Sequence, residues 1–271
     1  MRVNGVDLCV QTLGTETDPP ILLIMGSGGS LDFWEDEFCD RLVAGGRFVI
    51  RYDHRDTGQS VTYEPGHPGY TSADLVADAV GVIAALGLPR AHLVGMSMGG
   101  AIAQVAALDH PDRVASLTLI STSAMGPGLP GMAPRAQAFF QRARPEIDDP
   151  ALLDYLVDFE RAIASDQRPF DAAGTRARWE RALARADNVE SMLGNHDVVE
   201  GGLGWHKRLG EIAVPTLVVH GDDDPFMPLP HGAALAEAIP GARLLTIEAM
   251  GHELPRRTWD VVVPEILALT G

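Results

Sequence analysis

Short, solidly apolar runs alternate with longer amphipathic stretches along most of the chain, and this alternation limits the possible folds more than any other feature. Solid apolar runs are typical of strands buried on both faces, whereas the stretches between them have the period of helices. Strands and helices that alternate in this way form a mostly parallel, doubly wound sheet with helices on both faces. The expected buried strands are Ile21–Met25, Phe48–Tyr52, His92–Met96, Val114–Ile120, Pro215–His220 and Arg243–Ile247. The expected helices are Asp32–Ala44, Ser72–Leu86, Met98–Asp109, Pro230–Ala238 and Thr258–Leu269.

The early part of the chain carries two further signals. Val6–Leu13 alternates enough between apolar and polar residues to predict an antiparallel strand at the edge of the sheet. Ser72 stands at the beginning of one helical stretch and is expected to be its N-cap, because a serine oxygen can accept a free N–H of the first turn.

One long segment interrupts the alternation. From about residue 125 to residue 211 there is no strand-like run, but Ala151–Ala164 and Thr175–Leu193 have the apolar faces of helices. An insertion of this length between two core strands is better explained as a folded cap than as a loop. We therefore predict an α/β core of residues 1–124 and 212–271, with residues 125–211 as a helical cap over the site.

Length and charge narrow the classes of function. A chain of 271 residues buries most of the surface that it exposes when unfolded, so it needs no disulfides. Its 37 acidic and 21 basic side chains give a net charge of −16. Such a surface repels phosphate backbones and anionic headgroups, so we expect no nucleic-acid partner and no membrane partner. A monomer and a homodimer are both compatible with this composition.

The cysteines and the first residues predict a cytoplasmic protein. Cys9 and Cys39 are too few for a secreted disulfide scaffold and are expected to be free thiols. The first residues lack the apolar region of a signal peptide. No apolar run approaches the roughly 20 residues that a membrane-spanning helix needs.

The pentapeptide Gly95-Met96-Ser97-Met98-Gly99 matches the G-x-S-x-G pattern of a nucleophilic serine. A strand-like run leads into it and a helical run leads out, which is the context that this pattern requires. The flanking glycines let two backbones approach closely at a sharp turn. The turn places Ser97 at the N-terminus of a helix, where the dipole favours developing negative charge. A serine that only caps a helix is the alternative, and the context favours the nucleophile.

A serine nucleophile needs a base, and the base needs a carboxylate that fixes its tautomer. His252 is the best candidate base because it directly follows the last expected strand, so that the chain order is serine, acid, histidine. Three aspartates follow the strand that ends at His220. We expect Asp224 to be the acid, ahead of Asp222 and then Asp223, because Asp224 lies deepest in the loop and precedes a proline.

The other histidines carry weaker signals. His110 and His220 are expected to be structural, and His54, His67, His92 and His231 carry no sign of a role. His196 and His206 lie late in the expected cap and are weak candidates for residues that face the pocket.

The strand Ile21–Met25 runs into Gly26-Ser27-Gly28-Gly29-Ser30, a loop of small residues. We expect the backbone N–H groups of Ser27 and Met98 to form an oxyanion hole. The loop lacks the spacing and lysine of a P-loop and the G-x-G-x-x-G pattern, so no nucleotide cofactor is expected. The triple aspartate lacks the glycine and the spacing of a calcium loop, so no metal is expected either.

Together these motifs resemble the α/β-hydrolase superfamily over essentially the whole chain, with Met25-Gly26 where many members have His-Gly. The stretch of residues 53–60 resembles the loop that holds the oxyanion loop in relatives, which implies that Arg55 and Asp56 are scaffold residues. Within the superfamily, the core stretches Met-Gly, Tyr-Asp-His-Arg-Asp-Thr-Gly and Ala-Leu-Asp-His are similar to the aclacinomycin methylesterase type. Those carboxylesterases remove a methyl ester from an anthracycline polyketide. The expected cap resembles them far less.

The residues and the resemblance predict a serine carboxylesterase that hydrolyses a small-molecule ester, with a methyl ester as a candidate, through an acyl-enzyme. Carbon–carbon bond hydrolases, proline iminopeptidases and cofactor-free perhydrolases use the same triad, and the motifs do not separate them. A non-catalytic ligand-binding protein on a hydrolase fold is a further alternative. Dehalogenases and epoxide hydrolases are disfavoured, since they place an aspartate where this chain has Ser97.

Overall fold

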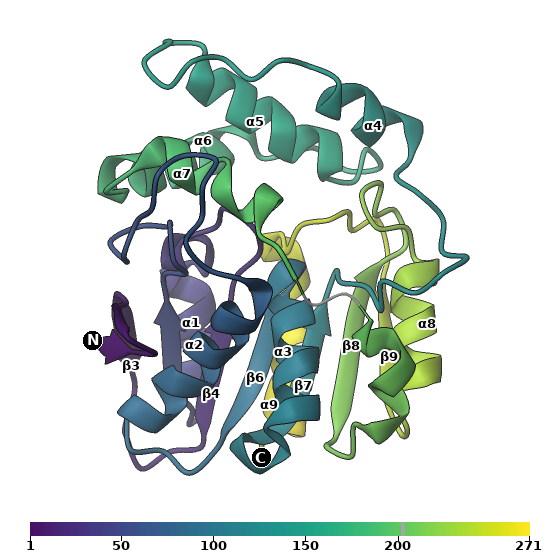
Figure 1. Ribbon diagram of the computed structural model, residues 1–271. Coiled ribbons are helices and arrows are strands. Elements are labelled where there is room, and N and C mark those ends of the chain that lie inside the picture. The colour runs from purple at the N-terminus through teal and green to yellow at the C-terminus, as the bar shows by residue number, and fades with distance from the viewer. Residues whose placement is uncertain (202–203) are drawn as a thin grey trace.

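The computed structural model describes residues 1–201 and 204–271, and its centre is a seven-stranded sheet with the order β3-β5-β4-β6-β7-β8-β9 (Figure 1). β3 pairs antiparallel with β5, and the other neighbouring strands in this order are parallel. The strands are β3 Val10–Leu13, β4 Pro20–Ile24, β5 Phe48–Tyr52, β6 Ala91–Met96, β7 Val114–Ile120, β8 Thr216–Gly221 and β9 Arg243–Ile247. The predicted mostly parallel, doubly wound sheet is confirmed.

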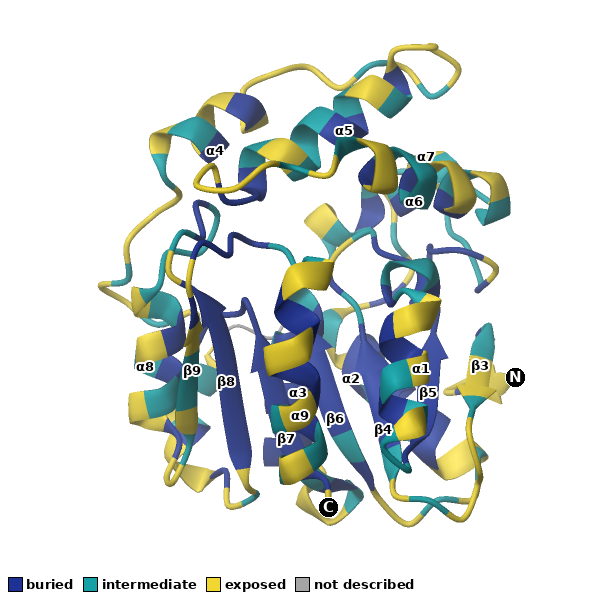
Figure 2. Cartoon of the chain, turned by 180° about the vertical axis from the view of Figure 1, so that it is seen from behind, coloured by how far each residue is buried: buried dark blue, intermediate teal, exposed yellow. Residues whose placement is uncertain are grey.

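Helices pack on both faces of this sheet because its strands are apolar on both sides. α1 and α9 share a buried cluster with one face, and α2, α3 and α8 share a cluster with the other. Figure 2 shows the result, with the central strands buried and each helix exposed only on its outer side. These helices are α1 Asp36–Ala44, α2 Ser72–Ala85, α3 Met98–Asp109, α8 Pro230–Ala238 and α9 Trp259–Leu269.

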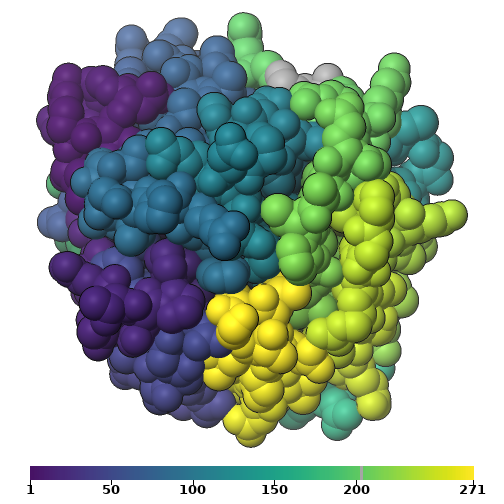
Figure 3. Space-filling view, turned by 90° about the horizontal axis from the view of Figure 1, so that it is seen from below, coloured from purple at the N-terminus to yellow at the C-terminus, as the bar shows by residue number. Residues whose placement is uncertain are grey.

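The end of the C-terminal helix also packs against an early part of the core. Seen from below, the last residues (yellow) lie next to early parts of the chain (purple; Figure 3). Arg47 makes part of this contact, since its Nε donates a hydrogen bond of 2.7 Å to Thr270 Oγ1 and its Nη2 donates to the carbonyl of Leu267. The loop before β5 is thereby tied to the end of α9.

Residues 125–211, called the cap segment below, connect β7 to β8 and lie over the carboxyl ends of the strands (Figure 1). Leu152, Leu156, Trp179, Ala182 and Met192 form a small apolar core of this segment, separate from the two clusters of the sheet. Its described elements are α4 Pro134–Phe140, α5 Leu152–Ile163, α6 Ala172–Arg185, α7 Val189–Met192, η3 Asn195–Val198 and η4 Trp205–Glu211. Its status as a separate domain stays a prediction.

Two local predictions at the start of the chain are wrong. Val6–Leu13 is not one strand, because Val6–Asp7 (β2) pairs with Arg2–Val3 (β1) and only Val10–Leu13 joins the large sheet. The N-cap of α2 is Thr71 and not Ser72: Asp74 Oδ2 accepts the backbone N–H of Thr71 at 2.8 Å, which closes a capping box.

Two predicted helix boundaries are also wrong. The stretch Thr175–Leu193 is divided into two helices. α6 ends at Arg185, the Asp187 N–H donates to the carbonyl of Gly58, and Asn188 is the N-cap of α7. The helix expected from Asp32 begins at Asp36 instead, after a separate 3-10 turn at Leu31–Phe33 (η1). Within the described residues, no helix is both long enough and apolar enough to cross a membrane.

Candidate active site

Ser97 stands at the turn between β6 and α3 with φ 52° and ψ −117°, a backbone conformation that costs energy in a non-glycine residue. Glycine is required on both sides of it. A Cβ on Gly99 would lie 2.1 Å from the carbonyl oxygen of Ile24, and a Cβ on Gly95 would lie 2.3 Å from that of Gly99. The absence of these two side chains lets α3 begin directly against β4, and Ser97 is held at the carboxyl edge of the sheet.

His252, in the loop after β9, reaches this serine. Its Nε2 lies 3.0 Å from Ser97 Oγ, and its Nδ1 lies 2.8 Å from Asp224 Oδ2. Because a carboxylate accepts, Nδ1 carries the proton and Nε2 is free to accept from the serine hydroxyl. The backbone N–H of His252 donates to the carbonyl of Ile163, at the end of α5, so the cap segment also positions this loop.

Of the three aspartates after β8, only Asp224 contacts His252. Its second oxygen, Oδ1, accepts the backbone N–H groups of Phe226 and Met227 at 2.9 and 2.8 Å, which fixes the carboxylate. Asp222 instead accepts the backbone N–H of Ala249, and Asp223 accepts the hydroxyl of Ser165. The turn therefore divides the three carboxylates among three partners and points one of them at the histidine.

The oxyanion loop, residues 25–29, passes beside the serine. A Cβ on Gly26 would lie 3.3 Å from the Cβ of Ser97, and Ser27 lines the same cavity as Ser97 and His252. The N–H of Met98 belongs to the first residue of α3, where helix geometry offers no intrahelical acceptor. The structure brings these groups together around Ser97; their role as an oxyanion hole stays a prediction.

Two histidines to which the sequence gave little weight hold this loop. His54 Nε2 donates to the carbonyl of Met25 at 3.0 Å, and Gly28 N–H donates to His196 Nδ1 at 2.9 Å. His54 lies within the stretch 53–60 that resembles the loop holding the oxyanion loop in relatives, although that resemblance singles out only Arg55 and Asp56. His196 lies in no motif, so no local signal could have found it. His206, the other histidine of the cap segment, lies beside Gly126 instead.

Arg55 and Asp56 both lie in the buried framework behind the oxyanion loop. Arg55 donates two hydrogen bonds to the carboxylate of Asp78, at 2.7 and 2.8 Å. Asp56 Oδ2 accepts the hydroxyl of Tyr70 and the side-chain amide of Asn195. These contacts tie the loop after β5 to α2 and to η3, which agrees with the scaffold role that the resemblance implied.

A cavity of about 860 Å³ lies between Ser97 and the cap segment. A cavity of this size accommodates a molecule as large as a typical drug. Aromatic side chains from both the core and the cap segment make up much of its wall: Phe33, Trp34, Phe38, Phe139, Phe140, Tyr155, Phe159, Phe170, Trp179, Phe226 and Trp259. The Phe226 ring packs edge-on against the His252 imidazole, with 4.7 Å between centroids.

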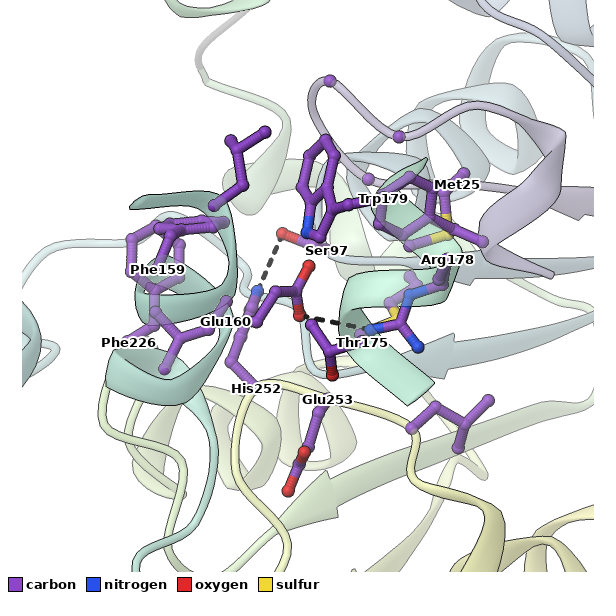
Figure 4. Close-up of a pocket in the computed structure, with 18 of the residues that line it drawn as sticks. Met25, Ser97, Phe159, Glu160, Thr175, Arg178, Trp179, Phe226, His252 and Glu253 are labelled. Atoms are coloured by element: carbon purple, nitrogen blue, oxygen red, sulfur yellow. Dashed lines mark hydrogen bonds and ion pairs between the residues drawn. The ribbon is translucent and has the colours of Figure 1, made fainter. Parts of the chain in front are cut away.

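Charged groups interrupt this apolar wall beside the serine (Figure 4). Glu160 of α5 and Arg178 of α6 lie 3.7 Å apart, and Arg178 also lies 3.6 Å from Glu35 of the core. Burial raises the pKa of the Glu253 carboxyl, which lines the same cavity next to His252. Within the described part of the chain, no cluster of His, Cys, Asp and Glu side chains has the geometry of a metal site.

Comparison with known proteins places the chain among hydrolases of the same fold. The family described as "alpha/beta hydrolase fold" matches residues 19–255. The chain is 34% identical to the rhodomycin D methylesterase DauP of Streptomyces sp. (strain C5) and 35% identical to DnrP of Streptomyces peucetius, covering 98% of this chain and 96% of each relative. The esterase RhEst1 from Rhodococcus sp. ECU1013 superimposes with a TM-score of 0.80 at 24% identity, covering 99% of this chain and 97% of that one. This last likeness concerns the fold alone.

Proposed function

The chain belongs to the α/β-hydrolase fold family, and we propose that it is a serine carboxylesterase that hydrolyses a small-molecule ester through an acyl-enzyme. The observation that carries this proposal is the hydrogen-bonded series Ser97–His252–Asp224 on the wall of the cavity. A serine, a neutral histidine and a buried carboxylate in this order supply a nucleophile, a general base and the group that stabilises the imidazolium.

The reaction begins when Ser97 Oγ attacks the ester carbonyl and His252 Nε2 takes the hydroxyl proton. The N–H groups of Ser27 and Met98 stabilise the tetrahedral oxyanion. His252 then gives its proton to the leaving alcohol, and the acyl group remains on Ser97. In the second half, His252 takes a proton from water while the water oxygen attacks the acyl carbonyl. The bond from the acyl carbon to Ser97 Oγ then breaks, His252 returns the proton to Oγ, and the carboxylic acid leaves. Asp224 stays ionised and stabilises the imidazolium in both halves.

A methyl ester of a bulky, aromatic acid fits the cavity best. Aromatic walls bind flat apolar groups through stacked and edge-on contacts, and the volume exceeds what a short-chain ester fills. The names of DauP and DnrP give a methyl ester as the bond that those relatives cleave. The cavity supports a large aromatic group on the substrate, and the relatives' names support methanol as the leaving alcohol, so we propose a small alcohol portion and a large acyl portion.

The direct test compares hydrolysis of aromatic methyl esters and of p-nitrophenyl esters by the wild type and by Ser97→Ala. We expect turnover by the wild type and a loss of at least about 10⁴-fold in the variant, because the triad acts as a unit. Ser72→Ala, at the start of α2 and remote from the cavity, is the matched control. Mass spectrometry of the quenched reaction should find the acyl group on the peptide that contains Ser97.

Three results would contradict this proposal. Activity that persists in Ser97→Ala places the nucleophile elsewhere. A wild type that cleaves no ester, but cleaves ring-fission diketones or amides, assigns the same triad to a carbon–carbon hydrolase or an iminopeptidase. Labelling of Ser97 by a fluorophosphonate without turnover of any of these substrates favours a ligand-binding protein.

A further inference from the structure

Three consecutive residues of η3, in the cap segment, contact the framework around the oxyanion loop. The side-chain amide of Asn195 donates to Asp56 Oδ2 at 2.9 Å. His196 accepts the N–H of Gly28. The carboxyl of Asp197 has its pKa raised by burial, and Arg144 and the side chain of Ser27 offset part of that rise. The η3 turn of the cap segment thus packs against the loop beside Ser97.

His196 bridges two core loops through both of its ring nitrogens. Nδ1 accepts from the N–H of Gly28 at 2.9 Å, so Nε2 carries the proton and donates to the carbonyl of Arg55 at 2.9 Å. Protonation would place a second N–H against that of Gly28 and break the first bond. Burial, together with the neighbouring His54, lowers the pKa of His196 to about 3, so the ring stays neutral over the range in which an esterase is assayed.

His54 and His196 hold the two peptide groups that flank the Gly26–Ser27 peptide. His54 binds the carbonyl of the Met25–Gly26 peptide, and His196 binds the N–H of the Ser27–Gly28 peptide. The Gly26–Ser27 peptide, which carries the expected oxyanion donor, lies between them. Gly26 has no side chain to restrict its dihedral angles, and Gly28 has φ +68°. Within the loop, the carbonyl of the Gly26–Ser27 peptide accepts the N–H of Gly29 at 3.2 Å, so this peptide belongs to a short turn. The two histidines hold that turn from both sides, and the direction of the Ser27 N–H therefore depends on their bonds as well as on the turn.

We propose that His196 is a positioning residue for the oxyanion hole, which acts by accepting the hydrogen bond from Gly28 and thereby aims the N–H of Ser27. This inference rests on the proposed serine esterase mechanism. His196 lies 168 residues from Gly28, in the segment that also forms the roof of the cavity. The cap segment accordingly completes the catalytic geometry of the core in addition to enclosing the substrate.

Two substitutions separate the two bonds of His196. In His196→Asn, the amide oxygen can take the place of Nδ1 and accept from Gly28, whereas the bond to Arg55 is lost. In His196→Gln, the amide nitrogen can take the place of Nε2 and donate to Arg55, whereas the bond from Gly28 is lost. Each variant loses one buried hydrogen bond, so each is the control for the stability of the other.

We expect His196→Gln to lower kcat by about 10- to 100-fold with KM changed less than about threefold, somewhat less than the loss of an oxyanion donor itself. His196→Asn should retain kcat within about fivefold, because the acceptor for Gly28 remains. Affinity for phenylboronic acid, which forms an anionic tetrahedral adduct with a nucleophilic serine, should fall in parallel with kcat. Thermal melting should show similar losses in both variants.

Equal kcat values and equal boronate affinities in the two variants would overturn the proposal, since His196 would then act only as scaffold. A wild type without esterase activity would contradict the proposed function instead, and boronate affinity of the three proteins would still test His196. A wild type that neither hydrolyses esters nor binds the boronate would overturn both proposals.

Discussion

His252 Nε2 lies 3.0 Å from Ser97 Oγ, although 155 residues separate the two in the chain. Ser97 follows β6 and His252 lies in the loop after β9, and these strands are parallel members of one sheet. The carboxyl ends of parallel strands meet at one edge, where α/β proteins collect their functional residues. Asp224, in the loop after β8, completes the series from a strand between the other two.

Asp224→Asn should lower kcat by about 10⁴-fold with little change in KM, because an amide can turn its NH2 toward Nδ1 and select the wrong tautomer of His252. Ester hydrolysis at saturating substrate measures this loss. Asp222→Asn is the matched control, since Asp222 lies in the same turn but binds the backbone of Ala249. Equal losses in kcat in the two variants would show that the substitutions act by disturbing the loop, and would contradict a specific role of Asp224 in orienting His252.

Gly99→Ala should prevent the turn at Ser97 from forming. A Cβ there would lie 2.1 Å from a backbone oxygen of β4, and backbone atoms cannot move aside as a flexible side chain can. We expect a loss of about 3 kcal/mol or more in the free energy of unfolding, together with loss of activity. Gly131→Ala, where a Cβ would meet nothing within 4 Å, should leave urea denaturation nearly unchanged. A stable, active Gly99→Ala would contradict the close contact of α3 and β4.

The stability of the protein should fall as the pH falls below about 6.5, the ordinary pKa of histidine in an unfolded chain. Burial lowers the pKa of His92 to about 4 and that of His196 to about 3, and it also lowers those of His54 and His220. Between its folded and unfolded pKa, each group binds a proton only in the unfolded chain, so the free energy of unfolding decreases by about 1.4 kcal/mol per pH unit.

His196→Asn tests the contribution of one such group. Urea denaturation gives the free energy of unfolding at each pH between about 6 and 4. The slope of this free energy against pH should be smaller in the variant than in the wild type by about 1.4 kcal/mol per pH unit, which corresponds to one proton. His67→Asn, on the exposed surface, is the control. A slope in His196→Asn equal to that of the wild type would contradict a buried, neutral His196.

Glu160→Gln should change which charged esters the cavity accepts. The Glu160 side chain is only 14% exposed. The substitution removes its negative charge from the region near Ser97, while Arg178 stays in place through its contact with Glu35. We expect the ratio of kcat/KM for an anionic ester over a cationic ester to rise by about three- to tenfold. Glu180→Gln, exposed on α6, is the matched control. An unchanged ratio would mean that the carboxylate does not face the bound substrate.

Much of the core was predictable because its signals are local. A strand buried on both faces must be apolar throughout, and the elbow needs glycine beside Ser97 because backbone atoms stand where side chains would be. The end of α6 was not predictable, because the helical pattern of the sequence continues beyond it. The helix ends where the Asp187 N–H donates to the carbonyl of Gly58, which is far away in the sequence. Short α4 was missed for lack of a long periodic pattern.

The sequence by itself determined the order of strands and helices, the strained serine and the loops that carry Asp224 and His252, because each depends on neighbours along the chain. Only the tertiary structure decided which aromatic residues enclose the cavity and that His54 and His196 hold the oxyanion loop. Such contacts join residues up to 168 positions apart. They arise when distant segments pack together, and nothing in the residues beside His196 indicates that Gly28 is its partner.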